Sequence, residues 1–365
     1  MKKYRTFSAI ICALICAAFP LMPACGYSSV SVYDAFYFDA PVKAEAYGKE
    51  ISDETKGSVD ALLNSLDETF SAENGIMSAI NAAEAGERVR VNADFVYVLE
   101  KARTCYGFSD GKFDPTVFPL VKLWGFYPDY PVENFTLPAA EDIAAARAKT
   151  GFNQIVTEKA DENYYVYKTR SDVAADLGGA AKGYAADKIA EILSDAGIKK
   201  GYVSIGGSSI RILSVNELYV RHPEKSGEYL LKINCKNLAG VSVSTSGTYE
   251  RYYDVDGTRY SHIINPYTGF PSDTGVISVT VICGDGASAD CLTTALCLCS
   301  HDFGSPDDPE KSELVSYVKK VGQNPDYENC LIFAAAVSGG TKHLVTNAGE
   351  NSFSLVDADY RIIKV

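Results

Sequence analysis

A carboxylate, two adjacent glycines and a lysine stand close together in the run Asp176-Leu177-Gly178-Gly179-Ala180-Ala181-Lys182. We expect this run where a strand gives way to a helix. Gly178 and Gly179 let the backbone approach a ligand closely, and the free N–H groups and dipole at a helix start attract anions. Lys182 adds a mobile positive charge. The run suits a phosphate-bearing ligand, although similar glycines also mark ordinary strand-to-helix turns.

The helix that should follow is visible in the spacing of apolar residues. Ala185, Ile189, Ile192 and Leu193 recur at helical intervals, and Gly197 stands where a C-terminal cap is expected. The sequence therefore predicts a helix from the paired glycines to Gly197.

A second pair of residues lies far away in the chain. Asp290 and Thr294 are four residues apart in an alanine-rich stretch, and positions i and i+4 share one face of a helix. Their carboxylate and hydroxyl oxygens could then converge on a hard cation such as Mg²⁺. Alternatively, Asp290 only stabilises the start of a helix and Thr294 only fills space. The two motifs together favour a metal-assisted phosphate site more strongly than either one alone.

A third cluster spans 244–251 and 261–269. Between them, Asp256-Gly257 is typical of a tight hairpin turn, so we expect His262 on the returning strand, facing its partner strand. Its near-neutral titration would suit a general base. A single histidine is also often a structural group, and the chain has four: His222, His262, His301 and His343.

Five motifs in this order carry a family resemblance. They are 111–116 with 123–126, the run 176–187, the segment 202–207, the Thr245-Ser246-Gly247 and His262 segments, and 289–295. The sequence resembles the ApbE-type flavin transferases, FAD:protein FMN transferases often labelled thiamine-biosynthesis lipoproteins, over nearly all of the mature chain. In that family, FAD is bound with Mg²⁺, its pyrophosphate is cleaved, and FMN is esterified through phosphate to a threonine or serine of a partner protein, leaving AMP.

The resemblance implies a role for each matching residue. Asp290 and Thr294 would bind Mg²⁺ through their side chains, and the Gly179 backbone carbonyl would be the third protein ligand. His262 resembles the residue that deprotonates the acceptor hydroxyl, so that His262, Lys182 and Asp290 form the expected catalytic set. The expected cofactor-binding positions are Lys112, Phe113, Asp114, Asp176, Lys182 and Ile264.

Some positions depart from the family pattern. Asn265 stands where aspartate is usual, and Ser208 follows Gly206-Gly207 where asparagine or aspartate is usual. Neither change removes an expected metal ligand. Phe70-Ser71-Ala72 lacks a tyrosine often found there, so the residues that stack on the isoalloxazine ring are left open, with Phe38 as one candidate.

The inventory of residues agrees with the chemistry that the family implies. Attack on a diphosphate builds negative charge on phosphoryl oxygens and on the leaving AMP, which a cation and a lysine stabilise. Water in place of the acceptor would turn the same site into an FAD pyrophosphatase that yields FMN and AMP. A flavin-binding lipoprotein without catalysis is the third hypothesis, favoured if His262 or Asn265 fails to support activation of the acceptor.

The N-terminus is typical of a bacterial lipoprotein signal. A basic start, an apolar stretch from Phe7 to Phe19 and the sequence Leu21-Met22-Pro23-Ala24-Cys25 follow one another. We expect residues 1–25 to be this signal, ending at the lipidated Cys25, and 26–365 to form one flavin transferase domain held at the extracytoplasmic face of the cell membrane by its lipid alone. A cleaved secretory signal or a buried cysteine is the alternative.

Charge argues against nucleic acid as a partner. The chain has 34 basic and 47 acidic residues, and removal of Lys2, Lys3 and Arg5 with the signal would change its net charge from −13 to −16. An acidic surface repels phosphate backbones. The acceptor protein implied by the family is a membrane redox subunit or an extracellular flavoprotein, and solubility also explains the acidity.

Seven of the ten cysteines lie beyond Cys25. They show no CxxC pair and no zinc-ligand spacing, and several stand in apolar runs, which favours buried free thiols without excluding disulfides. The seven are Cys105, Cys235, Cys283, Cys291, Cys297, Cys299 and Cys330.

The fold class follows from the elements that must position these motifs. Amphipathic helices are predicted over 52–70, 92–106 and 139–149, and strands over 229–235, 241–244 and 275–283, with a closing hairpin around 347–351. We expect an α+β fold of mixed, mainly antiparallel sheets with packed helices, similar to ApbE proteins, in two lobes around a flavin cleft.

Overall fold

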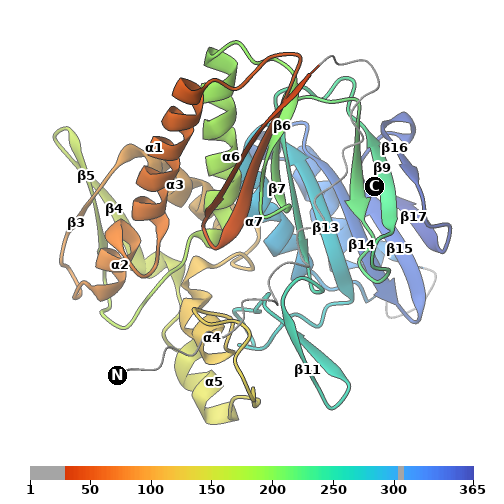
Figure 1. Cartoon of the computed structure of the whole chain (residues 1–365). Coiled ribbons are helices and arrows are strands. Elements are labelled where there is room, and N and C mark those ends of the chain that lie inside the picture. Colours follow the sequence, from red (N-terminus) through yellow and green to blue (C-terminus); the bar gives the residue numbers. More distant parts are fainter. Residues whose placement is uncertain (1–28, 303–307) are drawn as a thin grey trace, which may run out of the picture.

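The computed structural model describes residues 29–302 and 308–365 of the chain. Its main feature is a nine-stranded sheet in the order β1-β2-β6-β7-β10-β13-β14-β15-β17, with helices against one face (Figure 1). Two three-stranded sheets, β16-β9-β8 and β3-β5-β4, and the hairpin β11-β12 complete the strands. The strands are β1 (Val30–Tyr37), β2 (Ala40–Tyr47), β3 (Val89–Val91), β4 (Ile155–Ala160), β5 (Asn163–Lys168), β6 (Gly201–Ile205), β7 (Ser209–Ser214), β8 (Glu217–Arg221), β9 (Tyr229–Asn234), β10 (Val241–Gly247), β11 (Tyr252–Val255), β12 (Thr258–Ser261), β13 (Val276–Cys283), β14 (Leu331–Ser338), β15 (Thr341–Thr346), β16 (Phe353–Leu355) and β17 (Tyr360–Lys364).

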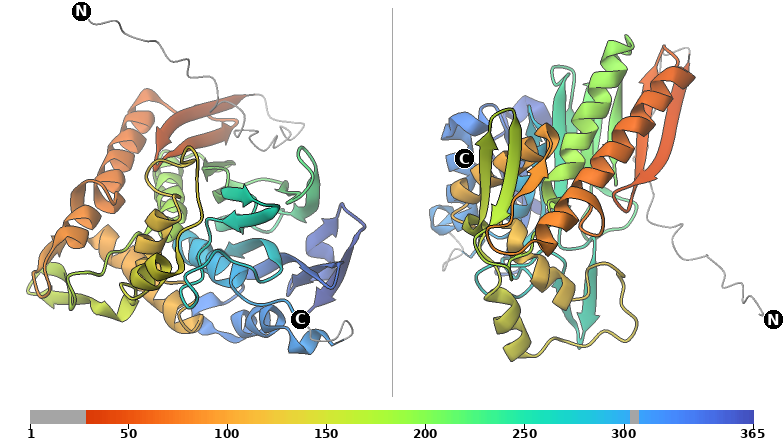
Figure 2. Two further views of the ribbon diagram at one scale, coloured as in Figure 1. Left: turned by 90° about the horizontal axis from the view of Figure 1, so that it is seen from below. Right: turned by 90° about the vertical axis from the view of Figure 1, so that its left-hand side faces the viewer.

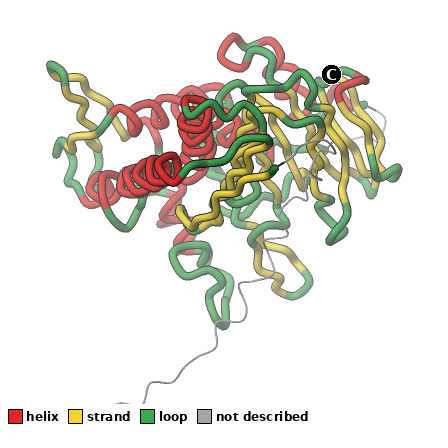
Figure 3. Tube along the Cα trace, turned by 45° about the horizontal axis from the view of Figure 1, so that its top comes forward, coloured by secondary structure: helices red, strands yellow, loops and turns green. Residues whose placement is uncertain are grey.

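Most of the helices lie on one side of the main sheet (Figure 3). The α-helices are α1 (Asp53–Phe70), α2 (Gly75–Ala82), α3 (Ala93–Phe108), α4 (Phe118–Leu123), α5 (Ala140–Arg147), α6 (Gly178–Asp195), α7 (Gly286–Cys297) and α8 (Glu313–Gln323). Short 3-10 turns lie at Pro115–Val117, Phe152–Gln154, Pro309–Lys311, Pro325–Tyr327 and Glu350–Ser352.

Alternation along the strands of the main sheet separates two buried cores, one on each of its faces. On β13, Val279 and Val281 face the helices and join the larger core, whereas Ile282 faces the other way. There it joins Leu231 and Ile233 of β9 in a second core, between the main sheet and the sheet β16-β9-β8. Because successive side chains of a strand point to opposite faces, this one sheet separates a helical layer from a β-layer.

The predicted helices are present, and side-chain capping explains where α1 and α3 begin. The Ser52 side chain accepts a hydrogen bond from the Thr55 N–H at the start of α1, and Asn92 does the same for Phe95 at the start of α3. Beside α1 runs α6, as the right-hand view of Figure 2 shows. The α6 helix is followed by Gly197 at a φ of +78°, as its capping role requires. The fold class expected from the sequence, α+β with mainly antiparallel strands, is confirmed.

Two local expectations were wrong. The preceding strand, β5, ends at Lys168, and residues 169–177 form a loop, so the glycine run is not a direct strand-to-helix turn. The end of the chain does not close as a hairpin either. The β15 and β17 strands pair in parallel, Leu344 opposite Ile362, because the connection first adds β16 to the small sheet.

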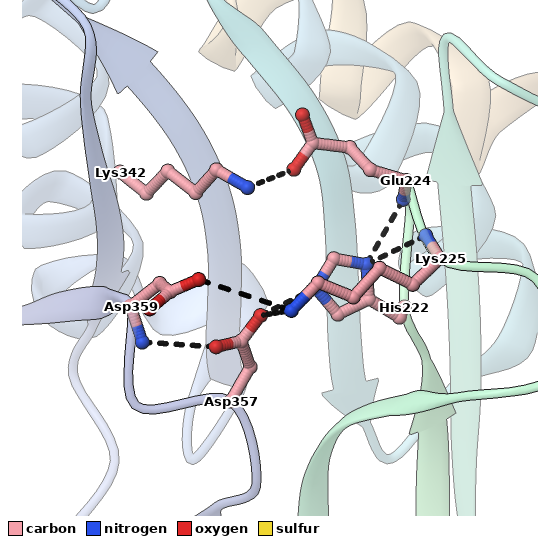
Figure 4. Close-up of polar contacts among 6 residues, drawn as sticks. All are labelled: His222, Glu224, Lys225, Lys342, Asp357 and Asp359. Carbon is pink, nitrogen blue, oxygen red and sulfur yellow. Dashed lines mark hydrogen bonds and ion pairs between the residues drawn. The ribbon is translucent and has the colours of Figure 1, made fainter.

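A buried histidine, His222, links the end of β8 to the segment between β16 and β17 (Figure 4). His222 Nδ1 accepts from the backbone N–H groups of Glu224 and Lys225, both at 3.0 Å, and Nε2 lies 2.8 Å from Asp357 Oδ2. Since Nδ1 accepts two hydrogen bonds, Nε2 must carry the proton that is donated to Asp357. Burial and this network assign His222 a structural role.

The cysteines follow the sequence prediction only in part. Cys105, Cys235, Cys291, Cys297 and Cys299 are buried free thiols, as expected. Cys283 and Cys330 instead form a disulfide with a Cα–Cα distance of 4.6 Å, which joins the end of β13 to the residue before β14. The two strands are antiparallel neighbours, so their ends meet although the cysteines are 47 residues apart.

The predicted signal and Cys25 lie outside the described residues. Within the described part of the chain, no helix is both long and apolar enough to cross a membrane.

Candidate active site

The loop that leads to the glycine run is held by buried polar contacts. Lys168 Nζ donates to the carbonyls of Asn81 (2.7 Å) and of Ser171 and Val173 (both 3.0 Å). The Asn81 amide in turn donates to the Ala175 carbonyl at 2.9 Å and accepts from the Ala175 N–H at 2.8 Å. These contacts fix the backbone just before Asp176.

Asp176 itself folds over the start of α6. Its Oδ1 accepts the Gly178 N–H at 3.0 Å, and Lys182 Nζ donates to the Gly178 carbonyl at 2.8 Å. Burial raises the pKa of Asp176, while the Gly178 hydrogen bond and the charges of Lys182 and Arg251 oppose that rise. Asp176 and Lys182 therefore both contact Gly178 at the start of α6, as their spacing indicated.

Asp290 lies against the same helix. Its Oδ2 accepts the Gly183 N–H at 2.7 Å, and its Oδ1 accepts hydrogen bonds from the Ser209 hydroxyl at 2.8 Å and from the Ser244 hydroxyl. Burial raises the pKa of Asp290, and the charge of Lys182 is the largest opposing influence. The structure thus brings the carboxylate of α7 to within one helical turn of Gly179.

Thr294 follows one turn later on α7, where its hydroxyl donates to the Asp290 carbonyl at 3.4 Å. Asp290 does not cap this helix, because the Asp285 side chain takes that position and accepts the Ser288 N–H at 2.7 Å. The structural alternative considered for Asp290, stabilising a helix start, therefore describes Asp285 instead.

The donor set fits a hard cation. A carboxylate has about four lone-pair positions; protein donors occupy three at Asp290, which leaves one on Oδ2. Thr294 gives its proton to a carbonyl, so the lone pairs of its hydroxyl remain. The Gly179 carbonyl oxygen has two lone pairs, so it can bind a cation even where it also accepts one backbone hydrogen bond within α6. All three expected ligands offer oxygen, the element that Mg²⁺ prefers.

No group of three or more His, Cys, Asp and Glu side chains in the described residues could hold a metal ion. The expected ligand set needs no such group, since Asp290 is its only member of those four residue types and the others are a hydroxyl and a carbonyl.

His262 lies just beyond the hairpin rather than on it. The turn is as predicted, with Asp256 and Gly257 at φ of 50° and 79°, but β12 ends at Ser261. The backbone N–H of His262 donates to the Arg251 carbonyl at 3.0 Å, and its Nδ1 lies 3.2 Å from the same oxygen. A carbonyl only accepts, so Nδ1 carries a proton and the lone pair of the neutral ring is on Nε2.

The pKa of His262 is lowered to about 4. Desolvation is the largest cause, and the positive charges of Arg251 and Lys182 act in the same direction. The ring is therefore neutral at physiological pH. Lys182 acts electrostatically on His262, Asp176 and Asp290, so residues of all three sequence motifs lie within electrostatic range of its ammonium group.

Four further residues were expected to bind the cofactor: Lys112, Phe113, Asp114 and Ile264. Phe113 packs on the helix start, where a Cβ added to Gly179 would lie 3.2 Å from its ring. Asp114 caps the 3-10 turn that follows it, accepting from the backbone and hydroxyl of Thr116. Lys112 forms an ion pair with Glu313 of α8 at 2.7 Å.

Ile264 is buried in an aromatic cluster that also contains Trp124 and Phe126. Phe38, the candidate for flavin stacking, forms the β1–β2 turn with Asp39, both at positive φ. The charge of Asp39 helps to raise the pKa of Asp176, so this turn lies within electrostatic range of the start of α6.

Sequence reasoning missed the groups that orient the expected ligands. Gly183, Ser209 and Ser244 hold the Asp290 carboxylate, and the Arg251 carbonyl fixes the His262 ring. Ser244 and Arg251 stand in a motif that was noted, but nothing in one sequence says which hydroxyl faces a residue 46 positions away.

The chain is similar to known proteins in sequence and in fold. A sequence profile described as the ApbE family matches residues 29–305. The FAD:protein FMN transferase of Escherichia coli (strain K12) is 36% identical over 198 residues, which cover 52% of this chain and 54% of that protein. The match thus spans about half the length of this relative. The Vibrio cholerae protein of the same name is 31% identical over 254 residues, covering 67% of this chain and 73% of the relative.

Solved structures show the same fold. The ApbE protein of Thermotoga maritima superposes with a TM-score of 0.69 at 29% identity, covering 84% of this chain and 94% of the other. The apo form of the flavinyl transferase ApbE of Pseudomonas stutzeri gives 0.69 at 25% identity, covering 88% and 95%.

Proposed function

This chain belongs to the ApbE family, and from that premise we propose that it transfers FMN from FAD to a threonine or serine hydroxyl of a partner protein, with Mg²⁺ bound and AMP released. The acceptor oxygen forms a bond to the phosphorus of the FMN half of the diphosphate. The bond from that phosphorus to the bridging oxygen breaks, and AMP leaves with this oxygen and the electron pair. The acceptor proton passes to His262.

Asp290, Thr294 and the Gly179 carbonyl would hold the metal through the lone pairs described above. When bound there, Mg²⁺ neutralises part of the charge that develops on phosphoryl oxygens. Lys182 supplies a second positive charge beside them. Its ammonium group already influences the pKa values of Asp176 and Asp290, so a diphosphate between these residues would lie within its field.

His262 is suited to accept the proton. Its Nδ1–H is fixed by the Arg251 carbonyl, which directs the Nε2 lone pair away from the hairpin backbone. A positioned base of this kind contributes roughly 10²–10⁴-fold to a rate. The lowered pKa keeps the ring unprotonated over the whole physiological range, but it also makes His262 a weaker base than a free imidazole, so its contribution rests on its position.

One observation carries the proposal: the Asp290 carboxylate accepts the Gly183 N–H at 2.7 Å. This contact joins the two motifs that the chemistry needs in one place, a metal-binding carboxylate and a glycine-lysine helix start, although they are 107 residues apart. Either motif alone has an ordinary structural explanation.

We also propose that residues 26–365 form one transferase domain, exported and held at the outer face of the cell membrane by lipid on Cys25. Its acceptor would be a membrane redox subunit or an extracellular flavoprotein, which fits a catalytic domain kept at the membrane. Fractionation of cells that express the full chain tests the anchor. Cys25→Ala should move the protein from the membrane to the soluble fraction, and its retention in the membrane would contradict the proposal.

A single assay tests the activity. Purified protein is mixed with FAD, Mg²⁺ and a protein fragment that carries a threonine acceptor motif. Flavin fluorescence on the denatured fragment, together with AMP in equal amount, supports the transferase. Free FMN and AMP without labelled fragment would indicate a pyrophosphatase, and intact bound FAD would indicate a flavin-binding protein.

The matched variants are Asp290→Asn and Asp195→Asn. Both exchange a carboxylate for an amide of the same shape, but Asp195 is exposed at the end of α6. Asp290→Asn should abolish labelling while the protein stays folded by circular dichroism, and Asp195→Asn should label at the parent rate. Unchanged labelling by Asp290→Asn would refute the assigned metal site.

A further inference from the structure

The two helices of the site carry the same short pattern. On α6, Gly183 is followed four residues later by Asp187, and on α7, Gly286 is followed four residues later by Asp290. Each glycine and its aspartate therefore lie one turn apart on one helix face. Asp187 has no part in the proposed chemistry.

These four residues bind one another reciprocally. Asp290 Oδ2 accepts the Gly183 N–H at 2.7 Å, and Asp187 Oδ2 accepts the Gly286 N–H, also at 2.7 Å. Each carboxylate thus takes a backbone donor from the opposite helix. A hydrogen bond to a charged acceptor is short and strong, and two of them acting in opposite directions prevent the helices from sliding along each other.

The glycines are required for this contact. A Cβ added to Gly183 would lie 2.1 Å from the Gly286 carbonyl oxygen, and one added to Gly286 would lie 2.3 Å from the Gly183 carbonyl oxygen. Backbone meets backbone, so no side chain can move aside to make room. The two helices cross with their backbones in direct contact, which brings each N–H within reach of a carboxylate as short as aspartate.

A second set of contacts fixes Asp187. Its Oδ1 accepts from the Ser242 hydroxyl and lies 3.4 Å from Arg211 Nη1. The same Arg211 nitrogen donates to Ser242 Oγ at 3.0 Å and to the Gly284 carbonyl at 2.8 Å. Asp187 is therefore tied to β7 and β10 as well as to the first residue of α7.

We propose that Asp187 is a positioning residue for the metal site: through the reciprocal Gly-x-x-x-Asp contact it sets the register of α7 on α6 and so aims the Asp290 carboxylate and Thr294 at the cation. The inference rests on the proposed function for the identity of the bound group. Asp187 touches neither of the two side-chain ligands and acts through Gly286, one helical turn before Asp290.

The chemistry of the carboxylate explains why register matters. Asp290 has a single lone-pair position left for a cation, on the oxygen that also binds Gly183. A shift of α7 by a fraction of an ångström would lengthen that bond and let the carboxylate turn. Groups that orient metal ligands in this way typically change metal affinity about 10–100-fold when they are mutated.

The test is metal binding to the intact protein, with Mn²⁺ in place of Mg²⁺ and free Mn²⁺ counted by electron paramagnetic resonance. Asp187→Ala should weaken Mn²⁺ binding about 10–100-fold. Asp187→Asn should restore most of the affinity, because its amide oxygen can still accept the Gly286 N–H. In the transferase assay the concentration of Mg²⁺ at half-maximal rate should rise, while the rate at saturating Mg²⁺ falls much less.

Asp195→Ala, on the exposed end of the same helix, is the matched control and should bind Mn²⁺ like the parent. Should Asp187→Ala not fold, Ser242→Ala removes one support of Asp187 and should give a smaller shift in the same direction. Mn²⁺ affinity within twofold of the parent in folded Asp187→Ala would overturn the inference.

A second readout separates this inference from the proposed function. In protein labelled with ¹⁵N-glycine, the Gly183 amide should exchange its hydrogen faster in Asp187→Ala, although Asp187 does not contact it. A parent protein that binds no Mn²⁺ would overturn the metal site and, with it, the stated role of Asp187. Unchanged Gly183 exchange would overturn the positioning even where flavin transfer is observed.

Discussion

Replacement of Gly286 by alanine should separate the two helices that carry the site. The added Cβ would lie 2.3 Å from the Gly183 carbonyl oxygen and 2.9 Å from Gly183 Cα. An ordinary contact between such atoms needs at least about 3.4 Å, so α7 must move by roughly 1 Å. The same movement lengthens both reciprocal hydrogen bonds, each 2.7 Å long, to about 3.7 Å, beyond hydrogen-bond range.

The expected loss of stability has two sources. Overpacking of a rigid contact costs about 1–3 kcal/mol. Each hydrogen bond to a charged group contributes about 1.5–3 kcal/mol, and alanine returns up to about 1 kcal/mol through its higher helix propensity. The free energy of unfolding should therefore fall by about 3–8 kcal/mol, a large part of the roughly 5–15 kcal/mol typical of a folded domain.

Urea unfolding followed by circular dichroism measures this difference. Gly284→Ala is the control, because a Cβ at Gly284 meets nothing within 4 Å and its carbonyl, which accepts from Arg211, is unchanged. The control should unfold within about 0.5 kcal/mol of the parent. A Gly286→Ala protein that unfolds within 1 kcal/mol of the parent would refute the close helix crossing.

Three other predictions concern single groups. The His262 ring should titrate near pH 4 in an NMR experiment whose signals are assigned with His262→Asn, and a midpoint near 6.5 would contradict this. The free energy of unfolding should decrease as the pH falls from 6.5 to 4, because only the unfolded state takes up the proton in that range. Reduction of the Cys283–Cys330 disulfide, which closes a 47-residue separation, should lower the free energy of unfolding by about 2–4 kcal/mol, and thiol counting should then rise by two. Lys168→Met leaves three buried carbonyls without their donor and should destabilise the protein by about 2–4 kcal/mol, whereas Lys159→Met, on the exposed side of β4, should have little effect.

Local signals in the sequence predicted local structure well. Ser52 and Asn92 were expected to begin helices, and each side chain caps the helix that follows it. Asp256-Gly257 was expected to form a tight turn, and both residues have the positive φ that such a turn requires. In these cases the information lies within a few residues, because caps and turns are decided by neighbours in the chain.

Pairings between distant segments could not be predicted in the same way. Nothing near Leu344 indicates that its strand will pair in parallel with Ile362 after a detour through another sheet. The cysteine pair has the same origin: Cys283 and Cys330 stand in unrelated local sequences and meet only because β13 and β14 are neighbours. Topology, not local propensity, decides both.

The proposed metal site shows why residue types can indicate a site that they cannot describe. Asp290 and Thr294 were identified from their spacing, but a lone carboxylate on a helix has no fixed direction. Its direction comes from Gly183 and from the serines at 209 and 244, which occupy three of its four lone-pair positions. Among the described residues, no group of three or more His, Cys, Asp and Glu side chains marks a metal site. The geometry proposed here depends instead on a helix crossing without side chains at its centre. Such a crossing has its own sequence pattern. On each of the two helices that meet at the ligand, a glycine stands four residues before an aspartate.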